Sequence, residues 1–194
     1  MTTRDQLGRI DPRIERSRIV ILRAAVEELA AVGYGAVTIE AVAARAGVGK
    51  STIYRHWPDK LALIADAFET FHEQMVPVVD AIPEREAVER LLRHVAEVVA
   101  DSTWSRCIPA LIEGSVRDPR VREFHHRYAA DRRRALVETI AAGLARGAFR
   151  QDLDPELAAV TLLGAIFYRR LMSPDPFAPE EVPALVEAVL PPLS

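Results

Sequence analysis

Cysteine is nearly absent from this sequence: the 194 residues include a single one, Cys107. One thiol excludes an intrachain disulfide framework and a multi-cysteine zinc site. No uncharged stretch approaches the ~20 consecutive apolar residues that a membrane-spanning helix needs. Residues 1–18 contain no apolar run of the kind found in secretory signal peptides. These absences predict a protein of the cytoplasm, a reducing compartment, without a membrane segment.

A strong net charge is also absent, because 28 acidic residues nearly balance 25 basic ones and leave a net charge of −3. Taken over the whole chain, this acidic total argues against a nucleic-acid partner. The charge is unevenly distributed, however: residues 1–60 carry +3 and the remainder carries −6. The imbalance fits a basic, anion-binding module joined to an acidic body, and it fits a chance imbalance of surface charge equally well.

Alternating patterns typical of β-strands are missing, and apolar residues instead recur about every 3.6 positions, as along residues 88–99. Hydrophobic residues make up 49% of the chain, which is enough for a globular core. Aspartate-proline pairs, as at 154–155, place an N-cap residue and an N1 proline where helices are expected to begin. We therefore predict an all-α fold of about nine helices, divided into residues 1–60 and residues 61–194.

Four of the nine glycines fall between Gly33 and Gly49. They separate three expected short helices, at residues 15–32, 38–46 and 50–57. Two short helices joined by a tight turn that contains glycine are typical of a helix-turn-helix. The first domain is therefore predicted to be a three-helix DNA-binding module.

The last of these helices is rich in hydrogen-bond donors, while Val48 and Ile53 provide its apolar anchors. Thr38 is expected to cap the preceding helix, and Lys60 falls in the first turn after Pro58. Donors gathered on one exposed helix suit base edges in a major groove and the phosphates beside it. The candidate DNA-binding residues are Thr38, Lys50, Ser51, Thr52, Tyr54, Arg55, His56 and Lys60.

The stretch from Thr38 to Leu63 resembles the helix-turn-helix of the TetR family of transcriptional regulators. The matching positions are Thr38, Val42, Ala43, Ala46, Gly47, Val48, Ile53, Tyr54, His56, Lys60 and Leu63, with Trp57 in an aromatic position. The resemblance implies phosphate contacts from Thr38, Tyr54 and Lys60. It implies base contacts from the three residues at 50–52.

Two features of this stretch need separate interpretation. Glu40 stands where some relatives carry a basic residue that reaches DNA. Its carboxylate could accept a hydrogen bond from a cytosine amino group or point to solvent, and repulsion by phosphates favours solvent. Residues 44–51 also fit a relaxed phosphate-binding loop, but that loop requires a preceding buried strand. The helical pattern here argues against nucleotide hydrolysis.

In the TetR family the region after the helix-turn-helix binds a small effector and forms the dimer, and the resemblance extends these roles to residues 61–194. The candidate ligand-binding residues are Phe68, Phe71, His94, Trp104, Phe124, Tyr128, Phe167 and Tyr168. Ordinary core packing is the alternative for each of them. The segment 154–172 is apolar on more than one side, as expected of a helix buried against its own core and a partner. The expected dimer-interface residues are Leu163, Gly164, Ile166 and Phe167, with the core helix of a monomer as the alternative.

No set of residues indicates catalysis. His125 and His126 are adjacent, so on a helix they diverge by ~100° and cannot share one metal ion. We therefore expect no enzymatic activity, no metal and no cofactor. The expected function is that of a homodimeric repressor, released from a palindromic double-stranded DNA operator by an unknown small-molecule effector. The alternative is a DNA-binding protein of the same fold with a structural or ligand-independent role.

Overall fold

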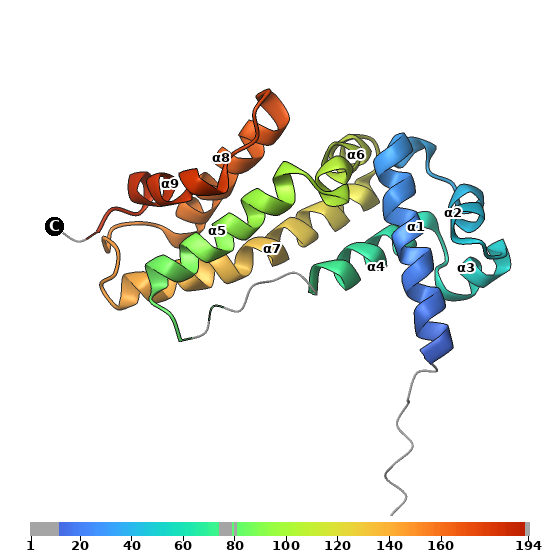
Figure 1. The fold of residues 1–194 in the computed structure, drawn as a ribbon, viewed down its shortest axis with the longest axis horizontal. Helices are drawn as coiled ribbons and strands as arrows, with labels where there is room; N and C mark the ends of the chain where they lie inside the picture. Colours follow the sequence, from blue (N-terminus) through green and yellow to red (C-terminus); the bar gives the residue numbers. More distant parts are fainter. Residues whose placement is uncertain (1–11, 74–78, 80, 193–194) are drawn as a thin grey trace, which may run out of the picture. The chain divides into compact units, whose positions relative to one another are not determined.

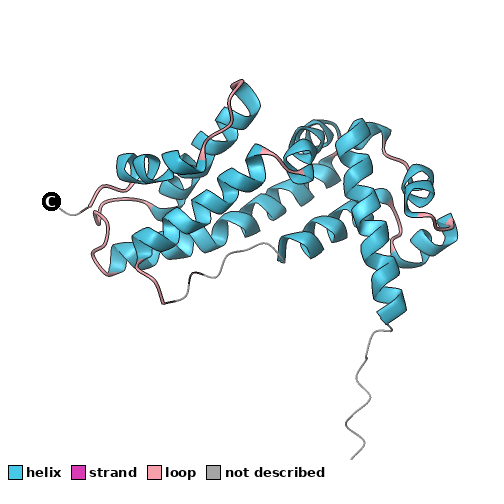
Figure 2. Cartoon of the chain, viewed as in Figure 1, coloured by secondary structure: helices cyan, strands magenta, loops and turns pink. Residues whose placement is uncertain are grey.

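The computed structural model describes residues 12–73, 79 and 81–192. Within these residues the chain forms nine α-helices, one short 3₁₀ helix and no strand (Figures 1 and 2), which confirms the all-α prediction. The helices are α1 (Pro12–Ala36), α2 (Ile39–Ala46), α3 (Lys50–His56), α4 (Lys60–Glu73), α5 (Glu84–Ala100), α6 (Thr103–Arg117), α7 (Pro119–Ala145), α8 (Pro155–Met172), η1 (Pro179–Glu181) and α9 (Val182–Val189). None of these helices is both long and apolar enough to span a membrane.

The chain divides into two compact units, residues 1–71 and residues 72–194. The first unit therefore contains most of α4 as well as the predicted three-helix module, whereas the sequence analysis divided the chain after residue 60. Side-chain hydrogen bonds explain the difference. Lys60 donates to backbone carbonyls at the end of α1, and Asp66 accepts from the indole of Trp57. These bonds attach α4 to the helices that precede it.

The long first helix follows the predicted apolar pattern, with Leu22 and Leu29 fully buried. Its assigned span includes an interruption at Gly33, whose φ of 77° and ψ of 163° are not helical. A side chain would resist this positive φ, whereas glycine adopts it freely. The expected helix stop at Gly33 is thus present as a break, and the turn that follows leads into α2.

The second unit is built around α5 and α7, which lie side by side in Figure 1. Helix α8 packs against both of them, and α9 packs against α5 and α8. Their shared core includes Leu92, Ile140, Leu162 and Val186, each 0% exposed and each from a different helix. Burial of these apolar faces supplies most of the driving force for folding of the unit.

Two helix starts in this unit agree with the aspartate-proline pattern. The Asp118 carboxylate accepts from the backbone N–H of Arg120 at 2.8 Å, at the start of α7. The Asp154 carboxylate accepts from the backbone N–H of Leu157 at 2.7 Å, at the start of α8. In each helix proline occupies the first turn, where its missing N–H costs nothing.

Candidate nucleic-acid interface

Helix α2, which leads into the turn before α3, is capped at both of its ends. Thr38 Oγ1 accepts from the backbone N–H of Ala41 at 3.1 Å and caps the start of α2. At the other end Gly47 adopts the left-handed conformation, with φ 69° and ψ 30°, and donates to carbonyls of the last turn of α2. Val48 N–H then donates to the carbonyl of Ala43 at 3.0 Å. The chain is thereby turned sharply into α3.

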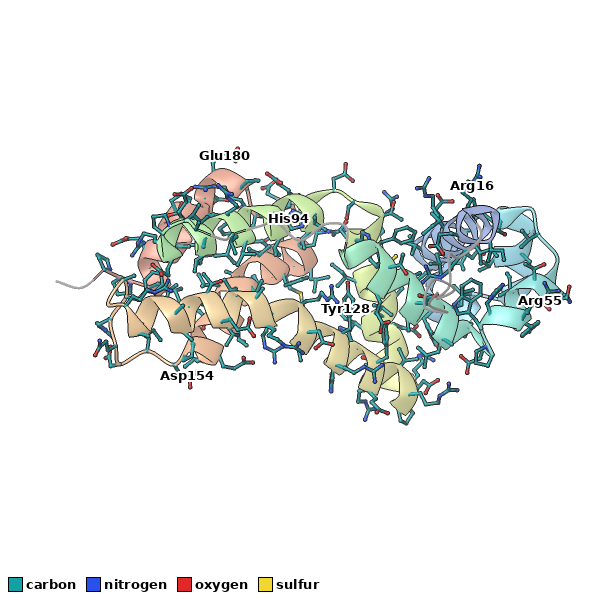
Figure 3. The ribbon with its side chains drawn as sticks, turned by 90° about the horizontal axis from the view of Figure 1, so that it is seen from below. Arg16, Arg55, His94, Tyr128, Asp154 and Glu180 are labelled. Carbon is teal, nitrogen blue, oxygen red and sulfur yellow. The ribbon has the colours of Figure 1, made fainter. Side chains whose placement is uncertain are left out.

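Helix α3 has one buried side and one exposed side. Ile53 is 0% exposed, and Trp57, directly after the helix, is 4% exposed. Between these anchors Tyr54 is 53% exposed, and Arg55, labelled in Figure 3, is exposed beside it. Lys50, Ser51, His56 and, before α2, Thr38 are also exposed, and Thr52 is partly exposed. All eight predicted DNA-binding residues are therefore at least partly exposed, and six of them lie on this one short helix.

Glu40 is exposed, as expected, but it has a partner within the protein. Lys50 Nζ donates to Glu40 Oε1 at 3.0 Å, which links the first turn of α3 to the first turn of α2. This hydrogen bond lowers the pKa of Glu40, and the same bond raises the pKa of Lys50, so both groups are charged at neutral pH. Lys50, which is predicted to contact a base, is therefore paired with the Glu40 carboxylate in the protein without DNA.

Lys60, the eighth predicted DNA-binding residue, has an internal role in the structure. Its Nζ donates to the backbone carbonyls of Tyr34 at 2.8 Å and Val37 at 3.2 Å, and it lies 4.5 Å from the centre of the Tyr34 ring. Tyr34 lies in the last turn of α1 and Val37 directly after the helix. Carbonyls of a last helical turn have no partner within the helix, and the dipole there is negative, so the ammonium of Lys60 is favourable at this position. Two of the three ammonium donors are used in this way.

Sequence reasoning missed a second anchor of α4, the carboxylate of Asp66. Its two oxygens accept from Trp57 Nε1 at 2.8 Å and from the guanidinium of Arg18 on α1. Thr70, one turn further along α4, accepts from Arg18 at 2.8 Å and donates to Asp66 at 3.2 Å. The clue in the sequence was Trp57, because a buried indole N–H requires an acceptor.

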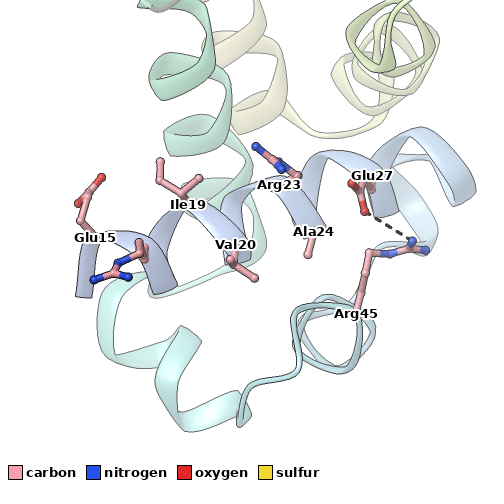
Figure 4. Close-up of a pocket in the computed structure, with 8 residues that line it drawn as sticks. Glu15, Ile19, Val20, Arg23, Ala24, Glu27 and Arg45 are labelled. Carbon is pink, nitrogen blue, oxygen red and sulfur yellow. Dashed lines mark ion pairs between the residues drawn. The ribbon is translucent and has the colours of Figure 1, made fainter. Parts of the chain in front are cut away.

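Helix α2 is attached to α1 by Arg45, which the sequence analysis left unassigned. Its Nε and a terminal nitrogen donate to Glu28 at 3.0 and 2.8 Å, and Glu28 is 8% exposed, the one buried charged residue in the described part of the chain. Beside this pair runs a groove of about 680 Å³ along α1, with Ile19, Val20 and Ala24 among its lining residues (Figure 4). None of the eight predicted ligand-binding residues lines this groove.

The predicted ligand-binding residues are divided between the two units. Phe68 and Phe71 belong to the first unit, where Phe68 is 2% exposed. In the second unit Phe124 is buried and lies 5.8 Å, between ring centres, from Tyr128 (Figure 3 labels Tyr128). Tyr168 differs from the others because it is 64% exposed. His94, Trp104 and Phe167 are partly buried.

The predicted dimer-interface residues lie on different sides of α8. Ile166 is 1% exposed and packs in the core of its own chain, so a partner could not reach it. Leu163 and Phe167 are partly exposed, and Gly164 is exposed. The large apolar side chains that α8 exposes are instead Leu157, Val160, Tyr168, Leu171 and Met172. The sequence showed that α8 is apolar on two sides, but not which residues occupy each side.

The described residues include no group of three or more His, Cys, Asp or Glu side chains that could hold a metal ion. Cys107 is fully buried, and burial raises the pKa of its thiol to about 12. The thiol is therefore neutral at physiological pH, whereas a nucleophilic cysteine requires its thiolate.

Comparison with known proteins identifies the family to which this chain belongs. The family described as bacterial regulatory proteins, tetR family, matches residues 21–67, and the family described as tetracyclin repressor-like, C-terminal domain, matches residues 83–189. The chain belongs to the TetR family. It is a helix-turn-helix transcriptional regulator, and the family's members are regulators of transcription, not enzymes.

Relatives of this TetR-family regulator resemble it along most of the chain. It is 32% identical over 167 residues to an uncharacterized HTH-type transcriptional regulator, YdeS of Bacillus subtilis (strain 168), which covers 84% of this chain and 83% of YdeS. Its fold resembles that of Salmonella enterica GusR, with a TM-score of 0.76, 20% identity and coverage of 94% of this chain and 98% of that one. It also resembles Bacillus subtilis FadR in complex with stearoyl-CoA, with a TM-score of 0.74, 18% identity and coverage of 91% and 99%. The last two likenesses show the fold alone.

Replacing Glu40 by glutamine should strengthen binding to duplex DNA of any sequence by about 2–10-fold, because the change removes repulsion of phosphates and releases Lys50. Fluorescence anisotropy at fixed salt measures this. Glu138→Gln, the same change at an exposed position in the second unit, is the control and should leave affinity unchanged. Weaker binding of the Glu40 variant would contradict the prediction and indicate that the carboxylate accepts from a base.

Replacing Lys60 by methionine should lower the free energy of unfolding by about 1–2 kcal/mol, because the carbonyls of Tyr34 and Val37 lose a charged donor while the hydrocarbon stem is kept. Urea denaturation measures the loss. Lys50→Met is the matched control, since Lys50 is bound only to an exposed acid, and its effect should stay within about 0.5 kcal/mol. Equal midpoints for the two variants would rule out the capping role.

Proposed function

We propose that this protein is a homodimeric repressor that binds a palindromic operator and leaves it when a small effector binds. The observation that carries the proposal is the exposed side of α3, where donor side chains lie opposite the buried Ile53 and Trp57. A helix that is anchored on one side and polar on the other can enter the major groove without losing its packing.

The side chains of α3 differ in what they can recognise. Lys50, Ser51 and Thr52 lie in the first turn, the part of a recognition helix that meets base edges. The Tyr54 hydroxyl, one turn later and half exposed, suits a phosphate oxygen. Thr38 already accepts a hydrogen bond through Oγ1, and its hydroxyl proton stays available for a phosphate.

The outer side of α8 supports the dimer. Leu157, Val160, Gly164, Tyr168 and Met172 recur every three or four residues, so they form one side of the helix. The four large side chains among them are 47–73% exposed, and a Cβ at Gly164 would meet no atom within 4 Å. An exposed apolar stripe with a small residue at its centre suits close contact with the same stripe of a second copy.

A two-fold dimer of this kind presents two copies of α3. Major grooves on one side of B-DNA recur every ~34–36 Å, so symmetric binding requires half-sites in inverted orientation, which is a palindrome. Two weakly basic modules bound together also gain affinity that neither has alone.

The contacts that hold α4 in the first unit provide a way for an effector to control DNA binding. Asp66 ties α4 both to α1 and to Trp57, the residue that follows α3. A ligand that displaces α4 would therefore disturb the position of α3, and release requires that the ligand prefer the displaced form. The FadR structure with stearoyl-CoA shows that a protein of this fold holds a small molecule.

Tyr54→Phe and Lys50→Ala should weaken DNA binding in different ways. Loss of the Tyr54 hydroxyl should weaken binding to operator and random DNA by similar factors, because a phosphate contact carries no base information. Loss of Lys50 should change the selected sequence, with discrimination reduced by about 1–3 kcal/mol at one base pair. Selection from a random DNA pool, followed by binding measurements, compares the two variants. Identical sequence preferences for Lys50→Ala and the parent would remove the base-reading role.

Gly164→Leu should convert the dimer into a folded monomer, because the added side chain is tolerated within the chain but separates the paired stripes. Light scattering should then give about the 21.5 kDa of one chain instead of twice that mass. Ala130→Leu, at an exposed position on α7, is the control and should remain dimeric. A parent protein that is monomeric at micromolar concentration would contradict the proposed dimer.

A further inference from the structure

A charged side chain continues the buried side of α8. Leu162 and Ile166 are 0% and 1% exposed and lie four residues apart, and Arg170 is the next residue in that series. Residues four apart share one side of a helix, so the register directs Arg170 toward the interior of the second unit. The apolar stripe proposed for dimerisation lies on the opposite side of the helix.

The guanidinium of Arg170 is poorly satisfied. Its Nε is buried and has no hydrogen-bond partner. One terminal nitrogen of Arg170 donates to Ser105 Oγ over a long distance of 3.5 Å. That oxygen is neutral and also accepts from the backbone N–H of Ser102 at 3.4 Å. Within the described part of the chain no carboxylate lies at ion-pair distance from Arg170.

Arg169, the neighbouring residue on α8, has a hydrogen-bond acceptor for each of its three guanidinium nitrogens. The three nitrogens of Arg169 donate separately to the carbonyl of Asp175, the carboxylate of Glu181 and the carbonyl of Pro176, at 3.2 to 3.4 Å. Arg169 is also stacked over the Phe177 ring. Within α8 the unpartnered Nε is therefore particular to Arg170 and is not a property of this end of the helix.

The part of α6 that contacts Arg170 adds no negative charge. Ser105 belongs to the first turn of α6, which contains no acidic residue. The dipole of a helix is positive at this end, so the helix repels the guanidinium. Cys107, two residues further along α6, is a neutral thiol because burial raises its pKa to about 12. Arg170 as a whole is partly buried, and its Nε is buried without a partner. An arginine cannot relieve the cost of this desolvation by losing its proton, and a desolvated cation in a protein is ordinarily paired with an anion.

We propose that Arg170 binds the acidic group of the effector, and that the effector is a small monocarboxylic acid with an apolar body. One guanidinium forms a two-bond fork with one carboxylate and balances a single negative charge. Next to Ser105 on α6, the buried Cys107 and the partly buried Ile108 are apolar, which suits the rest of such a molecule. This inference rests on the proposed effector-controlled function and specifies the chemistry of its ligand.

The test compares ligands that differ in charge alone. Thermal unfolding of the full chain is followed with octanoate and benzoate at millimolar concentration, and with the neutral octanamide and benzamide. We expect at least one carboxylate to raise the Tm while its amide does not. Arg170→Gln should weaken the apparent affinity for that carboxylate by about 10-fold or more, the loss expected for charge-assisted hydrogen bonds. Arg127→Gln, the same change at an exposed position on α7, should leave it unchanged.

The variants without ligand provide a second readout. If Arg170 awaits an anion, Arg170→Gln should unfold at a temperature no lower than Arg127→Gln, because the change removes an uncompensated charge. Marked destabilisation would show that the arginine is structural and would overturn the proposal. Equal stabilisation by acid and amide would overturn it as well, as would stabilisation by inorganic phosphate alone, or no stabilisation by either carboxylate.

Operator binding is measured separately, so that the two proposals can fail independently. Carboxylate binding that depends on Arg170 supports the anion site whatever happens on DNA. If the same carboxylate leaves operator affinity unchanged, the repressor-release function fails while the assignment of Arg170 as the anion-binding residue stands.

Discussion

The first unit depends on one carboxylate shared between three segments. Asp66 on α4 accepts from the guanidinium of Arg18 on α1 and from the indole of Trp57, which ends the recognition helix. Trp57 is almost fully buried and fixes the end of α3, as Ile53 fixes its middle. Because both oxygens of Asp66 are used, α4 cannot shift without breaking bonds to α1 or to the segment after α3. DNA recognition and any control that acts through α4 therefore meet at this residue.

The same unit shows that a count of basic residues does not measure a DNA-binding surface. Arg45 and Lys60 are committed to contacts within the protein, and Lys50 is paired with Glu40. Arg45 is held by the buried Glu28, and Lys60 by the carbonyls of Tyr34 and Val37. The side chains that remain available are mostly neutral donors on α3 with Arg55 among them. Recognition by such a surface depends more on hydrogen bonds than on charge, and in the proposed dimer the second copy would add affinity.

The inner and outer sides of α8 carry different kinds of residue. Its inner side carries Leu162 and Ile166 and then, one turn further, the charge of Arg170. Its outer side carries an apolar stripe with Gly164 at its centre. The two sides are separated by half a turn, so one helix can contact a partner copy and reach the interior of its own unit at once. A ligand held by Arg170 would bind a helix that also forms the proposed dimer contact.

The sequence by itself determined the helical fold, the caps at Thr38, Asp118 and Asp154, and the helix-turn-helix, because these follow from local periodicity and turn chemistry. It also identified which residues α3 exposes, since two apolar anchors define the orientation of a seven-residue helix. Tertiary structure decided what those patterns left open. It placed most of α4 with the first unit, gave Lys60 an internal role, and buried Ile166 while exposing its neighbours. These outcomes depend on partners distant in sequence, as when Asp66 meets Arg18 across 48 residues, and such pairings are set by the packing of helices and not by any local pattern.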